Sequence, residues 1–255
     1  MTISPFHLPA AGGAIVVTIP TRAELMAAIV ERFRAGEGFA LATINLDHVV
    51  KLAKPGPFAD GYRAQDFVVA DGNPIVWLSN LAGKPVELLP GSDLVPLLAE
   101  EAAAEGVTVA LLGATSEVLE KAARHLEARV SGLTVVAQLA PGLEFDPEGD
   151  EAGRLLAELG QSGAGLCFLA IGAPKQECMA ARGRKELPGV GFVSIGAGLD
   201  FLAGSQRRAP LWMRKLALEW IWRLWHHPGR LARRYFRCAM ILPRLCLDAL
   251  RQRNP

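Results

Sequence analysis

The stretch VTVALLGATSEVLEKAARHLEARVSGLTVVAQL, residues 107–139, carries the pattern that decides the fold. Residues 107–112 form an apolar run of strand length, and Gly113 ends it. Residues 116–130 place their charges on one side, as an amphipathic helix does. A second apolar run covers residues 133–139. Strands that alternate with helices in this way are typical of α/β proteins with a parallel sheet.

The same alternation extends over most of the chain. Its apolar runs lack a polar side, so we expect a mostly parallel sheet with helices on both faces. Strands are predicted at residues 39–44, 66–70, 107–112, 133–139, 166–171 and 190–195. Helices are predicted at residues 47–52, 74–81, 93–105, 116–130, 150–161 and 174–186, with Ser92 or Asp93 as the N-cap of the helix over 93–105.

Length, composition and charge distribution suggest two parts. The chain has 255 residues, of which 51% are hydrophobic and 21% charged, which argues for a large core. Residues 205–255 hold 12 Lys and Arg against 2 Asp and Glu, whereas residues 1–204 hold 15 against 24. We predict a catalytic core over 1–204 and a basic, aromatic-rich helical appendage over 205–255. Such asymmetry indicates a polyanion or a membrane surface as the partner of the appendage.

Other patterns exclude several classes of protein. The four cysteines form no CxxC pair and the histidines follow no metal or triad spacing, so no metal site is expected and the histidines are interpreted as structural or solvated. Residues 1–20 lack the basic start and long apolar run of a signal peptide. No segment supplies the roughly 18 unbroken apolar residues of a membrane span, and we expect a cytoplasmic protein.

The appendage combines aromatic and basic residues at helical spacing. Residues 211–225 have a broad apolar face and one charged stripe, made of Lys215, Glu219 and Arg223. After a break at 226–229, the next helix carries four arginines on one face, with apolar residues opposite. The arginines are Arg230, Arg233, Arg234 and Arg237, and the apolar residues are Leu231, Tyr235, Ala239 and Leu242. This face could bind anionic lipid head groups, clamp a diphosphate or remain solvated, and its Trp and Leu residues fit a nucleic acid less well.

Asp71 directly follows the strand expected over 66–70. Ligands of doubly wound sheets bind at the carboxyl ends of the strands, and Gly72 permits an unusual backbone angle there. Asp71 is therefore a candidate general base that takes the proton of a substrate hydroxyl. The alternative is that Asp71 caps the following helix, with Asn73 and Pro74 completing the turn.

The stretch GAPKQE, residues 172–177, stands at another strand end. Gly172 lets the backbone approach a ligand, Pro174 suits the first position of a helix, and free N–H groups there attract a diphosphate. Gln176 offers a donor and an acceptor to a sugar or a base. The alternative is a plain helix start with Lys175 exposed and Glu177 favoured by the helix dipole.

Two further strand ends contain glycine, in residues 111–117 and 194–204. Neither is a GxGxxG sequence or a P-loop, so binding of a dinucleotide or of ATP has weak support. Asp200 in the second stretch is either a second acid of the site or a turn residue.

Taken in order, these stretches resemble the WecG/TagA/CpsF family of bacterial glycosyltransferases, glycosyltransferase family 26. The matching elements are Thr43-Ile44-Asn45, Ala70-Asp71-Gly72, Gly91-Ser92-Asp93-Leu94, residues 172–177, Gly196-Ala197 with Asp200-Phe201 and Gly204, and a closing run. The closing run comprises Arg208-Ala209-Pro210, Leu218-Glu219-Trp220, Arg223-Leu224, Pro228, Arg230, Arg234 and Tyr235. The resemblance spans about residues 40–240 and rests on the ordered set of motifs, because each motif alone is weak.

The resemblance implies a Rossmann-like core and transfer, with inversion, of a sugar from a UDP-sugar to a polyprenyl-diphosphate-linked saccharide at the inner membrane face. It implies no metal and no cofactor. Asp71 would be the catalytic base. Substrate contacts are expected from the matching motifs and from arginines of the appendage. These residues are Thr43, Asn45, Gly72, Asp93, Gly172, Lys175, Gln176, Glu177, Asp200, Arg208, Arg214, Arg230, Arg233 and Arg234.

The sequence departs from the family at two positions. Leu88 stands where an Arg is expected, which affects one pocket contact, and Cys178 replaces an aromatic residue in what is interpreted as a packing position. The donor sugar stays open among glucose, N-acetylmannosamine and a uronic acid, and the chain could form homo-oligomers. Two alternative functions are retained: a nucleotide-dependent oxidoreductase, and a non-catalytic scaffold that binds a nucleotide sugar.

Overall fold

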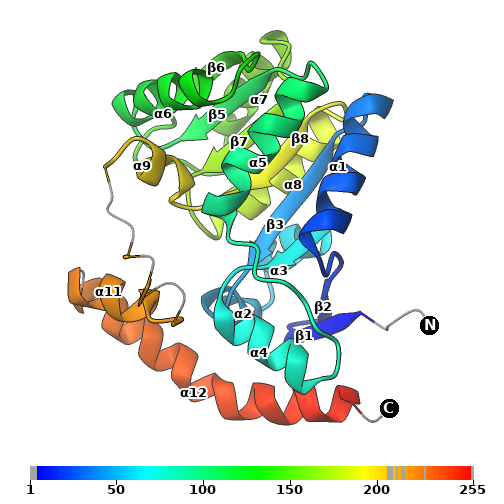
Figure 1. Ribbon diagram of the computed structural model, residues 1–255, viewed down its shortest axis with the longest axis vertical. Coiled ribbons are helices and arrows are strands. Elements are labelled where there is room, and N and C mark those ends of the chain that lie inside the picture. Colours follow the sequence, from blue (N-terminus) through cyan, green and yellow to red (C-terminus); the bar gives the residue numbers. More distant parts are fainter. Residues whose placement is uncertain (1–4, 206–208, 211, 214–215, 227, 254–255) are drawn as a thin grey trace.

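The computed structural model describes residues 5–205, 209–210, 212–213, 216–226 and 228–253. Its centre is a six-stranded sheet in the order β4-β3-β8-β7-β5-β6, and every neighbouring pair of strands is parallel (Figure 1). The strands are β3 (Phe39–Ile44), β4 (Phe67–Ala70), β5 (Val109–Gly113), β6 (Val135–Leu139), β7 (Leu166–Ala170) and β8 (Gly191–Ser194). The predicted α/β class and all six predicted strands are confirmed.

Helices cover both faces of this sheet. They are α1 (Arg22–Ala35), α2 (Leu46–Leu52), α3 (Pro57–Arg63), α4 (Asn73–Leu81), α5 (Gly91–Ala104), α6 (Ser116–Arg129), α7 (Asp150–Gln161), α8 (Lys175–Glu186), α9 (Gly198–Leu202), α11 (Glu219–His226) and α12 (Pro228–Arg253). Among them, α1, α3 and α9 were not predicted. The other helices of the core were predicted to within two residues at each end.

Alternate residues of the strands face two different cores. On β3, Phe39 and Leu41 pack with α1, α5 and α6, whereas Ala40 packs with α7 and α8. Further along the same strand, Ala42 and Ile44 pack with a third cluster, which involves α2, α3, α4 and α12. All six residues of β3 are buried, as expected for a parallel strand covered on both sides.

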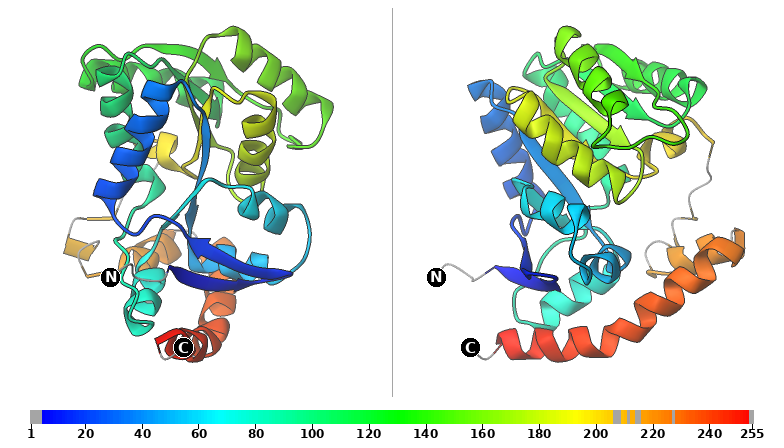
Figure 2. Two further views of the ribbon diagram at one scale, coloured as in Figure 1. Left: turned by 90° about the vertical axis from the view of Figure 1, so that its right-hand side faces the viewer. Right: turned by 180° about the vertical axis from the view of Figure 1, so that it is seen from behind.

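The third cluster joins the two ends of the chain. An antiparallel hairpin, β1 (Phe6–Ala10) with β2 (Gly13–Val17), contributes Phe6, Leu8 and other apolar side chains to it. The C-terminal half of α12 adds Leu245 and Ala249. The side-chain amide of Gln252 also accepts a hydrogen bond from the His7 N–H at 3.1 Å and donates one to the His7 carbonyl at 2.9 Å. Helix α12 therefore lies along the lower edge of the molecule, beside this hairpin (Figure 2).

The start of α5 differs from the prediction. The helix begins at Gly91, and its N-cap is Pro90, which makes no side-chain capping bond. A capping role for Ser92 or Asp93 is therefore wrong. The physical reason is packing: a Cβ atom on Gly91 would lie 2.9 Å from Ile195 Cα, so the helix start is pressed against the end of β8.

The appendage also differs from the pattern predicted for residues 211–225. The positive φ of 59° at Ala217 interrupts the helical path, and α11 begins only at Glu219. Glu219 and Arg223 of the predicted stripe form an ion pair, while Lys215 lies outside the described residues. Helix α12 starts at Pro228, inside the predicted break at 226–229, and continues through Pro243 to Arg253.

Candidate functional site

The carboxyl ends of β3 and β4 bring three predicted residues together. Ile44 and Ala70 are partners in the parallel register, so Asn45 and Asp71 follow side by side. The Asn45 Nδ2 group lies 3.4 Å from Asp71 Oδ2 and donates a hydrogen bond to it. Thr43 lies on β3, two residues before Asn45, and is buried. Its hydroxyl donates to the Ser194 carbonyl of β8 at 3.4 Å.

Asp71 is not a helix cap. The N-cap of α4 is Gly72, no side chain makes a capping bond there, and α4 begins with Asn73. Gly72 has a φ of 112°, a conformation that favours glycine. The capping alternative for Asp71 is therefore wrong, and its carboxylate is left for another task at the strand end.

The environment of Asp71 favours the protonated carboxyl group. Desolvation is the main cause and raises the pKa to about 6, while the Asn45 hydrogen bond opposes this rise. Charged residues of the appendage also affect this pKa: Arg223 and Arg234 lower it, and Glu219 raises it. A carboxylate with a pKa near the working pH is suited to accept a proton.

A buried polar cluster that the sequence did not reveal lies behind Asn45. The side-chain oxygen of Asn45, Oδ1, caps α2 by accepting the backbone N–H of His48 at 3.1 Å. His48 Nδ1 lies 2.6 Å from the Tyr62 hydroxyl, which donates to the Thr43 carbonyl at 3.4 Å. Burial lowers the pKa of His48 to about 3, so its ring is neutral. The i, i+3 spacing of Asn45 and His48, which suits a helix cap, was the only sequence signal for this cluster.

Gln176 and Glu177 lie inside the protein rather than at an open helix start. The Gln176 side chain donates to Glu177 Oε1 at 2.8 Å and accepts the Gly196 N–H at 3.1 Å, which ties α8 to the end of β8. Glu177 is fully buried, and desolvation raises its pKa to about 7. Pro174 is the N-cap of α8, not its first residue as predicted.

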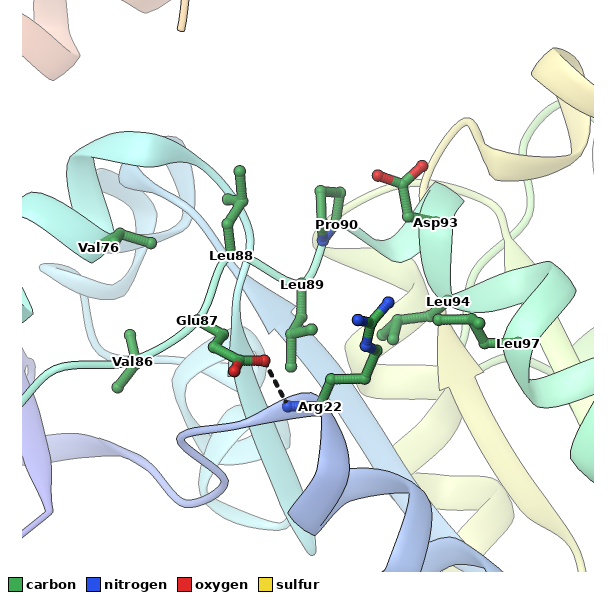
Figure 3. A pocket seen from close by; sticks show the side chains of 10 residues that line it. All are labelled: Arg22, Val76, Val86, Glu87, Leu88, Leu89, Pro90, Asp93, Leu94 and Leu97. Carbon is green, nitrogen blue, oxygen red and sulfur yellow. Dashed lines mark hydrogen bonds between the residues drawn. The ribbon is translucent and has the colours of Figure 1, made fainter. Parts of the chain in front are cut away.

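A cavity of about 390 Å³ lies under the loop between α4 and α5 (Figure 3). Its walls are mostly apolar and include Leu88, the residue that departs from the family pattern. Asp93 stands at its rim, and the Glu87 carboxylate accepts the Arg22 N–H at 2.8 Å. The Leu89 N–H donates to the Ala70 carbonyl at 2.7 Å, so this loop runs beside the strand that leads to Asp71.

A second cavity, of about 560 Å³, lies at the carboxyl ends of β5, β6 and β7. Lys175 and the N-terminal residues of α6, Thr115 and Ser116, line it. Gly172 adopts a φ of 74° on the turn that leads into α8. Leu143 also lines this cavity, and its side chain is completely exposed. Two helix N-termini and a lysine make this cavity attractive to an anion.

Asp200 lies on the short helix α9, partly buried, and desolvation raises its pKa. It is separate from the hydrogen-bonded group around Asp71 in the described contacts. The neighbouring Phe201 connects the core with the appendage, since the Arg223 guanidinium lies 5.9 Å from the centre of its ring.

The predicted arginines of the appendage do not share one role. Arg234 is partly buried, and its Nε lies 3.3 Å from Asp47 Oδ1 of α2, so it faces the core. Arg233 and Arg237 are exposed to solvent. On the opposite face Leu231 is buried, but Ala239 is exposed, which corrects the predicted apolar set. The side chain of Arg230 and the residues Arg208 and Arg214 lie outside what the structure describes.

No helix in the described part of the chain is long and apolar enough to cross a membrane. No group of three or more His, Cys, Asp or Glu side chains in the same part of the chain is placed to hold a metal ion.

Comparison with protein families gives a match that covers nearly the whole chain. The model of the glycosyl transferase WecG/TagA/CpsF family matches residues 13–255.

Proposed function

Because this chain belongs to the WecG/TagA/CpsF family of glycosyl transferases, which serves cell-wall or polysaccharide synthesis, we propose that it transfers a sugar from UDP to a lipid-linked acceptor. The acceptor is a polyprenyl-diphosphate-linked saccharide, and the reaction inverts the anomeric centre without a metal. The observation that supports this most is Asp71, a carboxylate with a raised pKa that no helix uses as a cap. Membership of a transferase family leaves the oxidoreductase alternative without support.

Asp71 supplies the base that this reaction needs. A sugar hydroxyl is a weak nucleophile at neutral pH, and removing its proton during attack increases its reactivity. The proton passes to the Asp71 carboxylate, the hydroxyl oxygen forms a bond to the anomeric carbon, and the bond from that carbon to the UDP oxygen breaks. Attack and departure on opposite sides of the carbon invert its configuration.

The cavity at β5, β6 and β7 suits the departing nucleoside diphosphate. Negative charge on UDP grows as it leaves, and preorganised donors lower the barrier most when they face that charge. The N-terminus of α6 and Lys175 supply such donors on one side of the cavity. The exposed Leu143 offers an apolar contact for a flat base at the rim.

The appendage suits an acceptor whose lipid lies in a bilayer. Exposed apolar residues follow one another along α12 at alternating spacings of four and three residues, which places them on a single face. They are Phe236, Met240, Pro243, Leu247 and Leu250. Exposed arginines run beside them at 233, 237, 244 and 251. A helix with apolar and basic stripes of this kind binds anionic membrane surfaces. We therefore place the protein at the cytoplasmic face of the inner membrane, as a peripheral protein.

The direct test measures UDP release from purified protein given a panel of UDP-sugars and a lipid-diphosphate-sugar acceptor. We expect release from one donor, dependent on the acceptor and resistant to EDTA. Asp71→Asn should lower the rate by at least about a hundredfold, because a positioned base contributes that much or more. Asp150→Asn is the matched control, since Asp150 is exposed at the start of α7 and makes none of the described contacts of Asp71.

Each outcome decides between the candidate functions. Acceptor-dependent release that Asp71→Asn abolishes and Asp150→Asn preserves supports the transferase and names the sugar. Binding of a UDP-sugar with no release from any donor, and unchanged biological activity of Asp71→Asn, would instead identify the non-catalytic scaffold.

A further inference from the structure

Both hydrogens and the oxygen of the Asn45 side-chain amide have hydrogen-bond partners. Its oxygen accepts the His48 N–H at 3.1 Å. Its nitrogen carries two hydrogens and has two neighbours at 3.4 Å, the ring atom His48 Nε2 and the carboxylate atom Asp71 Oδ2. The opposite orientation of the amide would set its oxygen against Asp71 and its nitrogen against an N–H group. The observed orientation is therefore the one that hydrogen bonding requires.

This orientation determines the tautomer of His48. An Asn nitrogen only donates, so His48 Nε2 must carry a free electron pair, and the proton of the neutral ring must be on Nδ1. Nδ1–H then donates to the Tyr62 oxygen, 2.6 Å away. The Tyr62 O–H in turn donates to the Thr43 carbonyl at 3.4 Å. The donors and acceptors from the β3 backbone to Asp71 thus form one consistent chain.

The surroundings keep this chain in a single state. His48 and Tyr62 are both buried, and Phe58 packs edge-on against both rings at centroid distances of 5.8 and 5.1 Å. The charged groups nearest His48 are Lys51, Asp47 and Arg234, and burial outweighs all of them in keeping the ring neutral. A positively charged His48 would lose the free electron pair that accepts from Asn45.

We propose that His48 and Tyr62 are positioning residues for the base: they hold the Asn45 amide so that it donates to one oxygen of Asp71 and leaves the other oxygen for the acceptor hydroxyl. This inference rests on the proposed function for its catalytic meaning, but its structural content can be measured without substrate. Neither residue touches the reacting atoms in this arrangement. The hydrogen bonds that connect them to Asp71 pass through Asn45.

The test compares Tyr62→Phe with the wild type by NMR. Imidazole ¹⁵N shifts report the tautomer of His48, and ¹³C shifts of labelled aspartates report the titration of Asp71. We expect the Nδ1–H tautomer in the wild type and a partial change to Nε2–H in Tyr62→Phe. The pKa of Asp71 should rise by roughly half a unit to one unit, because a long hydrogen bond to a charged group is lost.

Phe58→Leu is the matched control. It disturbs packing in the same cluster but removes no hydrogen bond, so the tautomer and the Asp71 titration should stay as in the wild type. A second pair of variants separates chemistry from folding: His48→Gln keeps an acceptor near the Nε2 position, whereas His48→Leu does not. We expect His48→Gln to retain a near-normal Asp71 titration that His48→Leu loses.

Two results would overturn the inference. One is the Nε2–H tautomer in the wild type. The other is an Asp71 titration that Tyr62→Phe leaves unchanged or shifts no more than Phe58→Leu does. In the UDP-release assay, Tyr62→Phe should move the acidic limb of kcat/KM upward by the same amount, with little change in KM above that limb. Failure of the wild type to release UDP would count against the proposed function alone, since the NMR result does not depend on turnover.

Discussion

At the scale of single residues, the ionised form of Asp71 is destabilised by its buried position at the end of β4. The surrounding protein removes water from its carboxylate and raises its pKa to about 6, although Asn45, Arg223 and Arg234 favour the charged form. Glu177 has the same problem, with a pKa raised to about 7 by burial and one oxygen that makes no hydrogen bond. Buried acids of this kind destabilise the folded state when they are ionised. Proteins retain such destabilising groups mainly at functional sites.

Asp71→Asn should stabilise the folded protein, and more so at high pH. The folded pKa is above the unfolded one, so the folded state binds the extra proton between about pH 4 and pH 6 and stability falls as pH rises through that window. Removing the charge should therefore add about 3 kcal/mol to the free energy of unfolding at pH 8, but less than about 1 kcal/mol at pH 4. Urea unfolding at both pH values measures this, and an equal gain at both would contradict it.

The rate of transfer should depend on pH through the same group. Asp71 acts as a base only when ionised, so a pKa of about 6 in the free protein predicts half-maximal kcat/KM near pH 6 and a tenfold fall for each further unit of acidity. A pH profile of UDP release at substrate concentrations well below KM provides the measurement. An acidic limb near the ordinary aspartate pKa of about 4 would show that Asp71 is solvated or is not the base.

At the scale of elements, α12 is a helix with separate tasks on separate faces. Leu231, Cys238 and Leu245 recur every seven residues and are buried, and Ala249 continues this line into the core. Arg234 lies near this face and approaches Asp47, which also pairs with Lys51 at 2.9 Å. The remaining surface carries the apolar and basic stripes. A single helix thus contacts α2, α4 and β1 on one side and presents a membrane-binding pattern on the other.

Leu245→Ala and Leu247→Ala should differ strongly although they lie two residues apart on α12. Leu245 is 4% exposed and packs in the cluster around the hairpin, so its truncation should cost about 2–4 kcal/mol of unfolding free energy. Leu247 is 58% exposed, and its truncation should change that free energy by no more than about 0.5 kcal/mol. Urea unfolding followed by circular dichroism makes the comparison. Equal effects would mean that α12 does not pack on the core as described.

At the scale of the whole molecule, the appendage lies across the edge of the sheet where the site is. Figure 1 shows α12 running below α2 and α4, the helices that follow β3 and β4, with α11 at the left end of α12. Charged groups of both helices influence the pKa of Asp71. The exposed apolar stripe of α12 faces away from α2 and α4. A membrane bound there would therefore bring a lipid-linked acceptor close to the base. The division at residue 205 stays a prediction.

Binding to vesicles should depend on the arginines beside that stripe. Arg233→Gln combined with Arg237→Gln should lower partitioning onto vesicles of phosphatidylglycerol and phosphatidylcholine by roughly thirtyfold, since each cation near such a surface contributes about 1 kcal/mol. The control is Arg124→Gln with Arg129→Gln, two exposed arginines on α6. Co-sedimentation gives the bound fraction. Equal losses in both double variants, or binding to pure phosphatidylcholine that matches the anionic mixture, would contradict an anionic membrane site on α12.

Much of the fold could be predicted because its signals are local. The runs at β3, β5 and β7 are apolar and bounded by glycine or proline, and α7 was predicted to the residue. Helix α1 was missed although the sequence contains a capping signal for it. Thr21 caps the helix by accepting the backbone N–H of Glu24, three residues later, at 3.2 Å. The hairpin β1–β2 was missed because Pro9 and two glycines weaken the strand pattern. Its stability also depends on distant elements, since β1 packs on α2 and α12 and β2 packs on β4.

The sequence by itself determined the class of sheet, the places where strands end and the position of Asp71 at one of them, because burial periodicity and turn residues act over a few neighbours. Only the tertiary structure decided which strand ends lie side by side, that Asp71 is not a cap, that Gln176 and Glu177 are buried, and that His48 and Tyr62 stand behind Asn45. Those facts depend on the order of strands in the sheet and on contacts between residues far apart in the chain. Local patterns do not encode such contacts, because the desolvation and hydrogen bonding that define a site arise only when the surrounding elements pack.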